Sequence, residues 1–511
     1  MLALAQSPSP SPAASAAAPP TSVVTVAVDV WPESLDPAVA QGGSPTVAGA
    51  LFEPLVRYKE GTQEFDPALS LAARVGVAGD GLLWEIALKA NQQFSDGSPI
   101  DAEAVAWSLG RLLKADHPAK PANLAVPGSI KGVVKNIVIR DKANLVIELA
   151  TPYSPMMALL ASPHAGLVSP ASFKDGKLAR VPVGAGAFVV AKDGPGHRLE
   201  LAPNAKFNRA HPSLTRVDIV PAPEGPARLL WLLAGRGDVL EGLAKRDLED
   251  LTAFPKFKVQ KAPGLGMVTL YLNPNVTPFQ APFIREAVIR GIPDELLSIM
   301  FYDSRSNTTR GFFPPWSWGS RGLFKPYGFD QVEAKRLIQT ANIDRNGTAF
   351  VMWVVPPDSM RKDVLPPFLE SLRAALRELS ISCLTEIVPR GELAKRMAVQ
   401  GPHAILYWHD AYLADPDEVA TQCVQKDQPL AKFANSSAQD DVQSLLLQAR
   451  TREQPSAREF LYQQLEEKMV SALTTITLGC PQRAIATAER ISAFKFGADG
   501  LVSLEDLKVA P

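Results

Sequence analysis

A loop rich in tryptophan and proline carries residue types suited to binding a small molecule. It reads FFPPWSWGS from Phe312 to Ser320 and follows Arg310. Tryptophans on such a loop offer a large apolar face with one N–H donor, so Trp316 and Trp318 could wall a ligand pocket. The guanidinium of Arg310 could meet a ligand carboxylate. The alternative is that both indoles pack against their own domain.

A second candidate segment covers residues 403–422, HAILYWHDAYLADPDEVATQ. Its apolar start, Ala404–Trp408, predicts a buried strand. The polar, aromatic and proline-containing residues that follow predict a loop. This segment is the best functional candidate in the chain, and the residues considered in it for ligand contact are Trp408, Asp410 and Tyr412. The alternative for Asp410 is a cap within the loop or a surface carboxylate.

Catalytic and metal chemistry find little support in the sequence. The six histidines form no H-x-x-x-H pair, and His403 and His409 stand apart. No G-x-S-x-G nucleophile motif is present, and GAGAF (Gly184–Phe188) lacks the G-K-[ST] ending of a phosphate loop. The three cysteines lie far apart without a C-x-x-C, so they could form one disulfide and one free thiol, or three buried thiols: Cys383, Cys423 and Cys480. We expect no cofactor, no metal site and no enzymatic activity.

Size and charge restrict the class of protein. A chain of 511 residues with 46% hydrophobic residues should form two or three domains. The 52 basic and 53 acidic residues nearly cancel, which argues against a nucleic-acid or polybasic membrane role. No apolar run reaches the roughly 18 residues of a transmembrane helix.

The first residues resemble the end of a secretory signal. Ala3-Leu4-Ala5 before Gln6 fits a small-residue cleavage site, although the charged and apolar regions that should precede it are missing. Residues 6–20 contain only Gln, Ser, Pro and Ala, and such a segment cannot bury enough apolar surface to order itself. We therefore expect residues 1–21 to be a signal-peptide remnant and a disordered tail.

Periodicity predicts alternating strands and helices throughout the rest of the chain. The clearest unit is a strand ending near Leu88, a turn at Asp96-Gly97, and a helix capped by Asp101. The expected strands are 23–29, 83–89, 133–139, 144–149, 187–191, 198–202, 216–221, 267–273, 349–355 and 404–408. The expected helices are 101–115, 226–235, 283–291, 330–341, 364–379, 391–398, 438–451 and 455–471.

Several motifs in order resemble one protein family. The pattern W-x-I-x-L-K, then F-S-D-G-x-P, then A-x-x-V-x-W-S, within residues 84–108, closely resembles the signature of the family 5 extracellular solute-binding proteins, the peptide, dipeptide and nickel receptors of ABC importers. The resemblance covers roughly residues 22–510 and continues in SLDPA (34–38), LFEPLVRY (51–58), GAGAF with LAPNAKFNRAHP (184–212), YLNPN with PFIREAVIRGIPDE (271–295) and YGFDQVEAKRLI (327–338). Phe207 and Asn208 replace the family's usual Tyr-Trp pair.

That resemblance implies an α/β fold of the periplasmic binding protein type, large and three-lobed (cluster C), with a hinge between two lobes. Domain I would combine 22–55, 182–265 and 482–511; domain II would be the insertion 56–181, and domain III would be 266–481. Two crossing segments, near Pro263–Met267 and Cys480–Arg483, would form the hinge. The ligand would lie between domains I and III.

The resemblance also implies the function of a periplasmic receptor. Such a monomer would capture a peptide or peptide-like solute by hinge closure and deliver it to the importer's permease subunits in the inner membrane. In peptide-binding members, an acidic residue after a tryptophan pairs with the peptide's α-ammonium. Here Asp410 follows Trp408 at a shorter spacing, so Asp410 or Tyr412 would take that place. The alternatives are a receptor for a chelated metal or a glycoside-like solute, and an enzyme or chaperone that reuses the fold.

Overall fold

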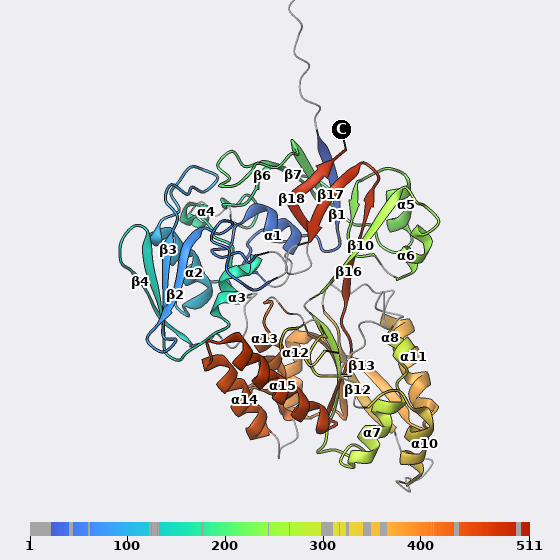
Figure 1. Ribbon diagram of the computed structural model, residues 1–511. Coiled ribbons are helices and arrows are strands. Elements are labelled where there is room, and N and C mark those ends of the chain that lie inside the picture. Colours follow the sequence, from blue (N-terminus) through green and yellow to red (C-terminus); the bar gives the residue numbers. More distant parts are fainter. Residues whose placement is uncertain are drawn as a thin grey trace, which may run out of the picture.

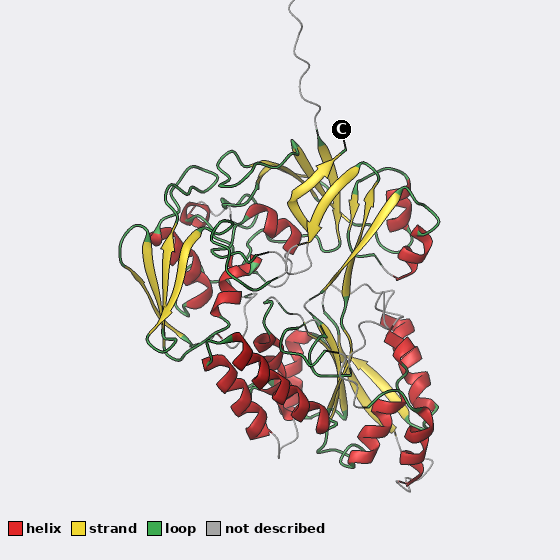
Figure 2. Cartoon of the chain, viewed as in Figure 1, coloured by secondary structure: helices red, strands yellow, loops and turns green. Residues whose placement is uncertain are grey.

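The predicted alternation of strands and helices folds into three main sheets. The computed structural model describes residues 22–39, 44–59, 62–121, 124, 130, 132–174, 178–243, 245–264, 266–297, 310–315, 317–322, 327–340, 349–357, 365–409, 411, 413–433, 439–496 and 502–510. The signal remnant and tail predicted for 1–21 lie outside these residues. Every predicted strand and helix is present, with ends shifted by a few residues at most. Helices and sheets form an upper lobe and a lower lobe, which are joined by long strands (Figures 1 and 2).

A seven-stranded mixed sheet forms the centre of the upper part. Its order is β10-β16-β9-β1-β8-β7-β6, in which β1 pairs in parallel with β8 and β9. The central strand β1 reads VVTVAV, an almost continuous apolar run, as expected for a strand covered on both faces. The strands are β1 (Val23–Val28), β6 (Phe188–Gly194), β7 (Arg198–Pro203), β8 (Arg216–Pro221), β9 (Val239–Leu240), β10 (Phe257–Pro263) and β16 (Gln482–Ala488). Around it lie α1 (Pro45–Leu51), α5 (Ala227–Leu233), α6 (Lys245–Leu251) and the hairpin β17 (Ile491–Phe496) with β18 (Val502–Val509).

An antiparallel unit is inserted beside this sheet. Its strand order is β2-β3-β5-β4. Trp84, Ile86 and Leu88 of β3 turn inward, and Asp101 caps α2 by accepting a hydrogen bond from the Ala104 N–H at 3.0 Å. The elements are β2 (Ala72–Ala78), β3 (Leu83–Leu88), α2 (Ala102–Leu113), β4 (Val134–Ile139), β5 (Asn144–Leu149), α3 (Met156–Ala161), η2 (Pro163–Ala165) and α4 (Pro170–Lys174).

A five-stranded sheet organises the lower part. Its order is β13-β12-β14-β11-β15, with helices packed on both faces (Figure 1). The strands are β11 (Met267–Leu272), β12 (Ala349–Val355), β13 (Ser382–Ile387), β14 (Ala404–His409) and β15 (Thr475–Gly479). The helices are α7 (Pro282–Gly291), α8 (Asp294–Leu297), α10 (Gln331–Thr340), α11 (Leu365–Arg377), α12 (Arg390–Val399), α13 (Pro416–Val424), η3 (Pro429–Phe433), α14 (Gln439–Thr451) and α15 (Pro455–Ser471).

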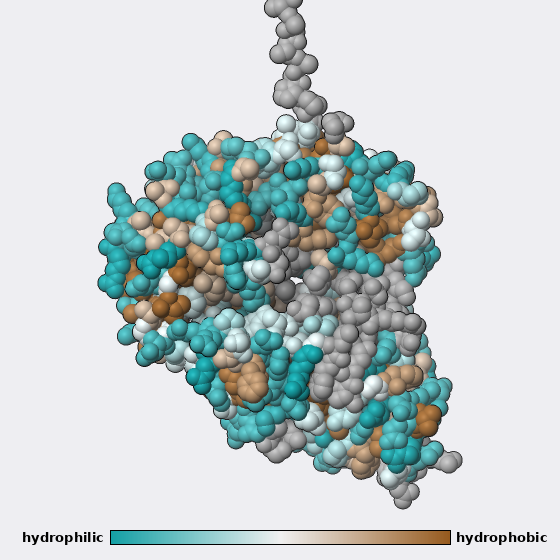
Figure 3. All heavy atoms as spheres, viewed as in Figure 1, coloured by the Kyte–Doolittle hydropathy of each residue, from teal (hydrophilic) through white to brown (hydrophobic). Residues whose placement is uncertain are grey.

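Apolar side chains gather in separate cores. Distinct buried clusters belong to the seven-stranded sheet, the antiparallel unit and the five-stranded sheet. On the face seen in Figure 3 the described surface is mostly hydrophilic, with hydrophobic side chains in small groups. No helix among the described residues is both long enough and apolar enough to cross a bilayer.

Candidate functional site

The carboxyl ends of strands from both lobes face each other where the chain crosses between them. β10 and β16 are antiparallel neighbours in the upper sheet, and β11 and β15 are antiparallel neighbours in the lower sheet. The chain therefore crosses once between Pro263 and Met267 and once between Gly479 and Gln482. Since β16 is antiparallel to β9, the carboxyl ends of β9 and β1 lie on the crossing side. In the lower sheet Met267 pairs with His409, so β14 and its parallel neighbour β12 end there too.

Ligands of open α/β sheets bind in the crevice outside the carboxyl ends of the strands. The residues that follow β1, β9, β12 and β14 are therefore the best candidates for ligand contact. Asp410 and Tyr412 directly follow β14, but both lie outside the described residues, as does Trp316. Their roles stay predictions.

The last residue of β14 is fixed by a buried hydrogen-bond chain. His409 is 2% exposed; its Nε2 lies 2.8 Å from the Tyr271 hydroxyl, and its Nδ1 lies 2.9 Å from Gln422 Oε1. An amide oxygen can only accept, so Nδ1 carries the proton and Nε2 accepts from Tyr271. The Cys423 thiol lies 2.9 Å from the same hydroxyl and can donate to it. Burial disfavours the imidazolium and lowers the pKa of His409 to about 3. The imidazole is thus a neutral anchor for the chain that leaves β14.

Trp408 points into the core of the lower lobe. Its side chain is 4% exposed and meets Phe368 edge to face, with ring centroids 6.4 Å apart. The backbone carbonyl of Trp408 accepts a hydrogen bond from Arg390 at the start of α12. The guanidinium of Arg390 also stacks on Tyr407, 5.3 Å from the ring centroid. Arg390, which sequence reasoning missed, follows the carboxyl end of β13 and therefore sits at the same edge.

The segment after β14 is shorter than the loop predicted from the sequence. The expectation of a loop through Gln422 was wrong, because α13 begins at Pro416. Asp415 caps this helix by accepting a hydrogen bond from the Asp417 N–H at 2.9 Å, and the proline occupies the first turn. The Leu413 N–H donates to the Glu418 carboxylate at 2.8 Å.

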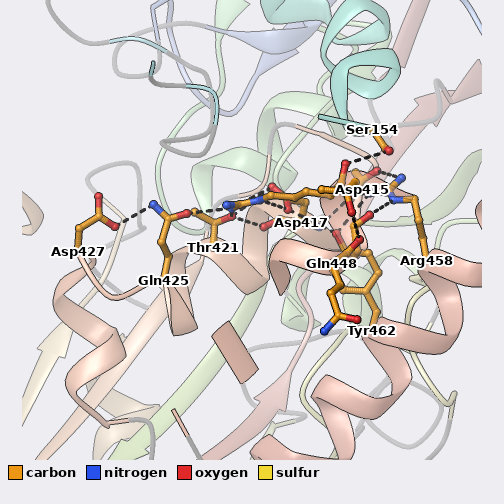
Figure 4. A network of polar contacts seen from close by, with 12 residues as sticks. Ser154, Asp415, Asp417, Thr421, Gln425, Asp427, Gln448, Arg458 and Tyr462 are labelled. Carbon is orange, nitrogen blue, oxygen red and sulfur yellow. Dashed lines mark hydrogen bonds and ion pairs between the residues drawn. The ribbon is translucent and has the colours of Figure 1, made fainter. Parts of the chain in front are cut away.

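A buried polar network holds the start of α13 against α14 and α15 (Figure 4). Arg458 binds both carboxylate oxygens of Asp415 at 2.9 Å. Asp417, fully buried, receives the Arg450 Nε–H at 2.7 Å. Bidentate guanidinium–carboxylate pairs fix geometry as well as charge, so Asp415 and the first turn of α13 are held in place.

Trp318 belongs to the same neighbourhood. Its ring lies 4.8 Å from the Arg458 guanidinium carbon and 5.6 Å from the Tyr462 ring. The fully buried carboxylate of Glu466 accepts hydrogen bonds from the backbone N–H groups of Phe312, Phe313 and Arg321. One face of α15 therefore holds both sequence-predicted candidate segments, which is a relationship that the sequence did not reveal.

Arg310 has structural partners. It is 5% exposed and contacts Asp294 Oδ1 through Nη2 at 2.7 Å and Nε at 3.0 Å. It also donates to the carbonyls of Ile289 and Ile292. These contacts tie the loop to the end of α7, and contact of Arg310 with a ligand carboxylate stays a prediction.

The upper lobe presents two carboxylates at the opposite edge. Asp29 follows β1 and pairs with Arg228 at 2.8 Å, and Glu241 follows β9 and accepts the Thr46 hydroxyl at 2.6 Å. Burial raises the pKa of Glu241, although Thr46 and Arg483 oppose that effect. Sequence reasoning did not single out these residues; an acidic residue directly after a short apolar strand was the available signal.

The described residues offer no metal site. Among them no group of three or more His, Cys, Asp or Glu side chains is placed to hold an ion. The three cysteines are separate buried thiols rather than a disulfide pair. Burial raises the pKa of Cys423 to about 12, so this thiol stays protonated near neutral pH.

Comparison with known protein families decides the class. Residues 66–429 match the model of the bacterial extracellular solute-binding proteins, family 5 Middle. The chain belongs to this family. Family 5 proteins are solute-binding components of ABC importers, so this chain is a binding protein and not an enzyme.

A curated relative agrees with the assignment to this family. The chain is 29% identical over 332 residues to the probable D,D-dipeptide-binding periplasmic protein DdpA of Escherichia coli (strain K12), a match that covers 62% of each chain. The alignment thus spans less than two thirds of that relative's length.

Solved structures share the fold. A periplasmic binding protein, DppA, from Helicobacter pylori in complex with the peptide STSA has a TM-score of 0.76 at 22% identity and covers 95% of this chain and 98% of its own. NikA from Brucella suis in complex with Fe(III)-EDTA has a TM-score of 0.82 at 17% identity and covers 96% of this chain and 100% of its own. At these identities the likeness establishes the family 5 binding-protein fold that the motifs predicted.

Proposed function

We propose that this family 5 protein is the periplasmic receptor of an ABC importer for a peptide or peptide-like amino compound. The observation that carries the proposal is the meeting of strand carboxyl ends from both lobes at the two crossing segments. Asp29 and Glu241 supply polar groups at the upper edge, and His409 ends β14 at the lower edge. Two facing edges with a narrow connection suit a ligand that is enclosed rather than bound on a surface.

Closure about the crossing segments would be the working motion. The open form exposes the crevice, and a ligand that touches both lobes stabilises the closed form by its differential contacts. The closed form would then dock on the permease subunits of the importer. We assign domain I to 22–55, 182–265 and 482–511, domain II to 56–181 and domain III to 266–481. The separate apolar cores support this division, and we expect the protein to act as a monomer.

Asp410 is our proposed partner for the ligand's ammonium group, with Tyr412 as the alternative. In the sequence both lie between His409 and Asp415, whose side chains are held by buried hydrogen bonds. Trp316 would supply an apolar wall from the neighbouring loop. Trp408 and Trp318, given their packing, would act mainly by supporting these segments.

Calorimetry and small-angle scattering on the purified protein test the proposal together. A panel of dipeptides and tripeptides should include a ligand that binds one to one, raises the melting temperature and compacts the protein. Tight binding of a peptide with an unchanged scattering profile, starting from an open ligand-free form, would contradict the closure mechanism. Absence of binding across the panel would contradict the peptide cargo.

A receptor for a chelated metal is the second candidate. The fold likeness to the Brucella suis protein in complex with Fe(III)-EDTA favours it. A chelate can be held through its organic ligand, so a protein metal site is not required. Native mass spectrometry and metal analysis of the protein as purified separate the two cargoes, since only the chelate brings a metal in stoichiometric amount. A glycoside-like solute would appear in the same spectrum by its mass.

A further inference from the structure

A leucine of the lower lobe is buried in the core of the antiparallel unit above it. Leu413, in the segment between β14 and α13, is 2% exposed and belongs to the apolar cluster that contains Leu55, Tyr153 and Leu159. The other members of that cluster come from residues 38–185. Leu413 therefore crosses from one lobe into the core of another.

Further hydrogen bonds join the antiparallel unit to the lower lobe. The side-chain amide of Gln63 donates to the Ala414 carbonyl at 2.9 Å. Ser154, just before α3, donates its backbone N–H to the Arg450 carbonyl at 2.9 Å, and its hydroxyl donates to the carbonyls of Arg450 and Arg452. The last carbonyls of a helix lack partners within the helix, so Ser154 satisfies the end of α14 from the other lobe. Figure 4 shows Ser154 directly beside the buried network of the lower lobe.

The lower-lobe side of this contact is rigid. The bidentate pair of Asp415 with Arg458 fixes the residue two positions after Leu413, and Glu418 fixes the Leu413 N–H. Tyr58 of the antiparallel unit lies close enough for the Asp415 carboxylate to add to burial in raising the pKa of its hydroxyl. Hydrogen bonds on the lower-lobe side therefore hold Leu413 in position, and its side chain packs into the apolar core of the antiparallel unit.

We propose that Leu413 with Ser154 forms a latch between the antiparallel unit and the lower lobe that holds the receptor closed around its ligand. The proposal rests on the closure mechanism given above. Since the crossing segments join the upper sheet to the lower one, opening about them must separate Ser154 from α14 and withdraw Leu413. Leu413 also lies shortly after His409, the end of the strand that we assign to the ligand site, so ligand contact and latching would act on the same short stretch of chain.

The latch makes a specific kinetic prediction. Leu413 is withdrawn only on opening, so its truncation should accelerate ligand release while leaving ligand entry into the open form nearly unchanged. Truncating a buried leucine weakens packing enough to shift a two-state balance at least about tenfold. We expect the dissociation rate constant of a bound peptide to rise by that factor in Leu413→Ala, and by a smaller factor in Ser154→Ala.

Hydrogen exchange of the ligand-free protein tests the latch independently of the cargo. The Ser154 amide bonds the Arg450 carbonyl only when the lobes are together, so Leu413→Ala should speed its exchange. The matched control is Leu393→Ala, which truncates a buried leucine of α12 in a different cluster of the same lobe. The latch predicts that the ligand-free parent spends a measurable fraction of time closed, and that the Ser154 amide is therefore protected from exchange. An unprotected amide in the ligand-free parent overturns the proposal, as does equal Ser154 exchange in the parent and in Leu413→Ala with folding intact by circular dichroism.

A second readout separates this proposal from the proposed function. If a peptide ligand is found, Ser154 exchange should slow on binding, and an unchanged rate would mean a permanent interface and no latch. If no peptide binds, the proposed cargo fails, yet the comparison of Leu413→Ala with Leu393→Ala in the ligand-free protein still decides on the latch.

Discussion

Gly264 donates its backbone N–H to the backbone carbonyl of Pro481 over 3.1 Å, so the two segments that cross between the lobes are bonded to each other. One crossing belongs to the chain entering the lower lobe and the other to the chain leaving it. This hydrogen bond links the two crossing segments, so we expect them to move together in the closure that we propose.

The same close approach predicts the effect of a small substitution. A Cβ at Gly264 would lie 2.5 Å from the Pro481 carbonyl oxygen, inside van der Waals contact. We expect Gly264→Ala to lower the free energy of unfolding by ~1–3 kcal/mol, as overpacking typically does. Urea denaturation measures the change. Gly391→Ala is the control, because that helical position has nothing within 4 Å and should be neutral or slightly stabilising. Equal stability of the two variants would mean that the crossing relaxes freely.

The buried imidazole of His409 predicts a loss of stability in acid. Its pKa is about 3 in the folded protein, against an ordinary value of 6.5, because burial excludes the charged form. Between these two values the unfolded chain binds one proton more than the folded chain. The free energy of unfolding should therefore fall as the pH drops below about 6.5, by up to ~1.4 kcal/mol per pH unit from this residue.

Urea titrations at pH 7 and pH 5 measure that slope. His409→Gln should be less stable at pH 7, since it disturbs the bond to Tyr271, but its stability should depend less on pH. His211→Gln, at an exposed position, should keep the parent slope. A variant at 409 that follows the parent curve at both pH values would show that the imidazole is not kept neutral by burial.

Local signals account for the elements that were predicted correctly. The unit from Trp84 to Leu113 could be read directly, because its strand alternates, its turn contains Asp-Gly and its helix begins with a capping aspartate. The helix predicted over 455–471 begins at Pro455, and a proline in the first turn of a helix is a local signal of the same kind. These features depend on neighbours within a few residues, and tertiary contacts do not override them here.

The start of α13 had a signal that was not used. Asp415, Pro416 and two further acidic residues form a capping aspartate, a first-turn proline and an acidic first turn. The preceding aromatic and polar residues led to a loop being predicted across all of them. Contacts between distant segments could not be predicted in this way. No local sequence pattern indicates that Arg458 pairs with Asp415 or that Leu413 is buried.

The burial of Trp408 predicts that its truncation lowers the folding stability of the protein as well as the affinity for ligand. A pocket wall would lose only ligand contacts on truncation, at ~1–3 kcal/mol of binding free energy. A side chain that is 4% exposed and packed on Phe368 should also cost the protein ~3–5 kcal/mol of folding stability when cut to alanine. We expect Trp408→Ala to show the stability loss in urea, and calorimetry of the folded protein shows whether binding falls too. Full stability with weakened binding would place the indole in the site.

The sharpest test concerns Asp410 and a cargo with a free ammonium group. Asp410→Asn keeps the shape and removes the charge, which leaves the ligand's ammonium buried without a counter-ion. Breaking such a pair typically costs ~3–5 kcal/mol, so the affinity for a free-amine peptide should collapse in a calorimetric titration. The N-acetylated form of the same peptide carries no such charge, and its affinity should change little. Tyr412→Phe is the matched control, because it removes one hydroxyl from the same segment without a change of charge. Equal loss of both ligand forms would indicate a general packing role for Asp410, whereas no loss of either would remove Asp410 from the site and turn the assignment away from peptides.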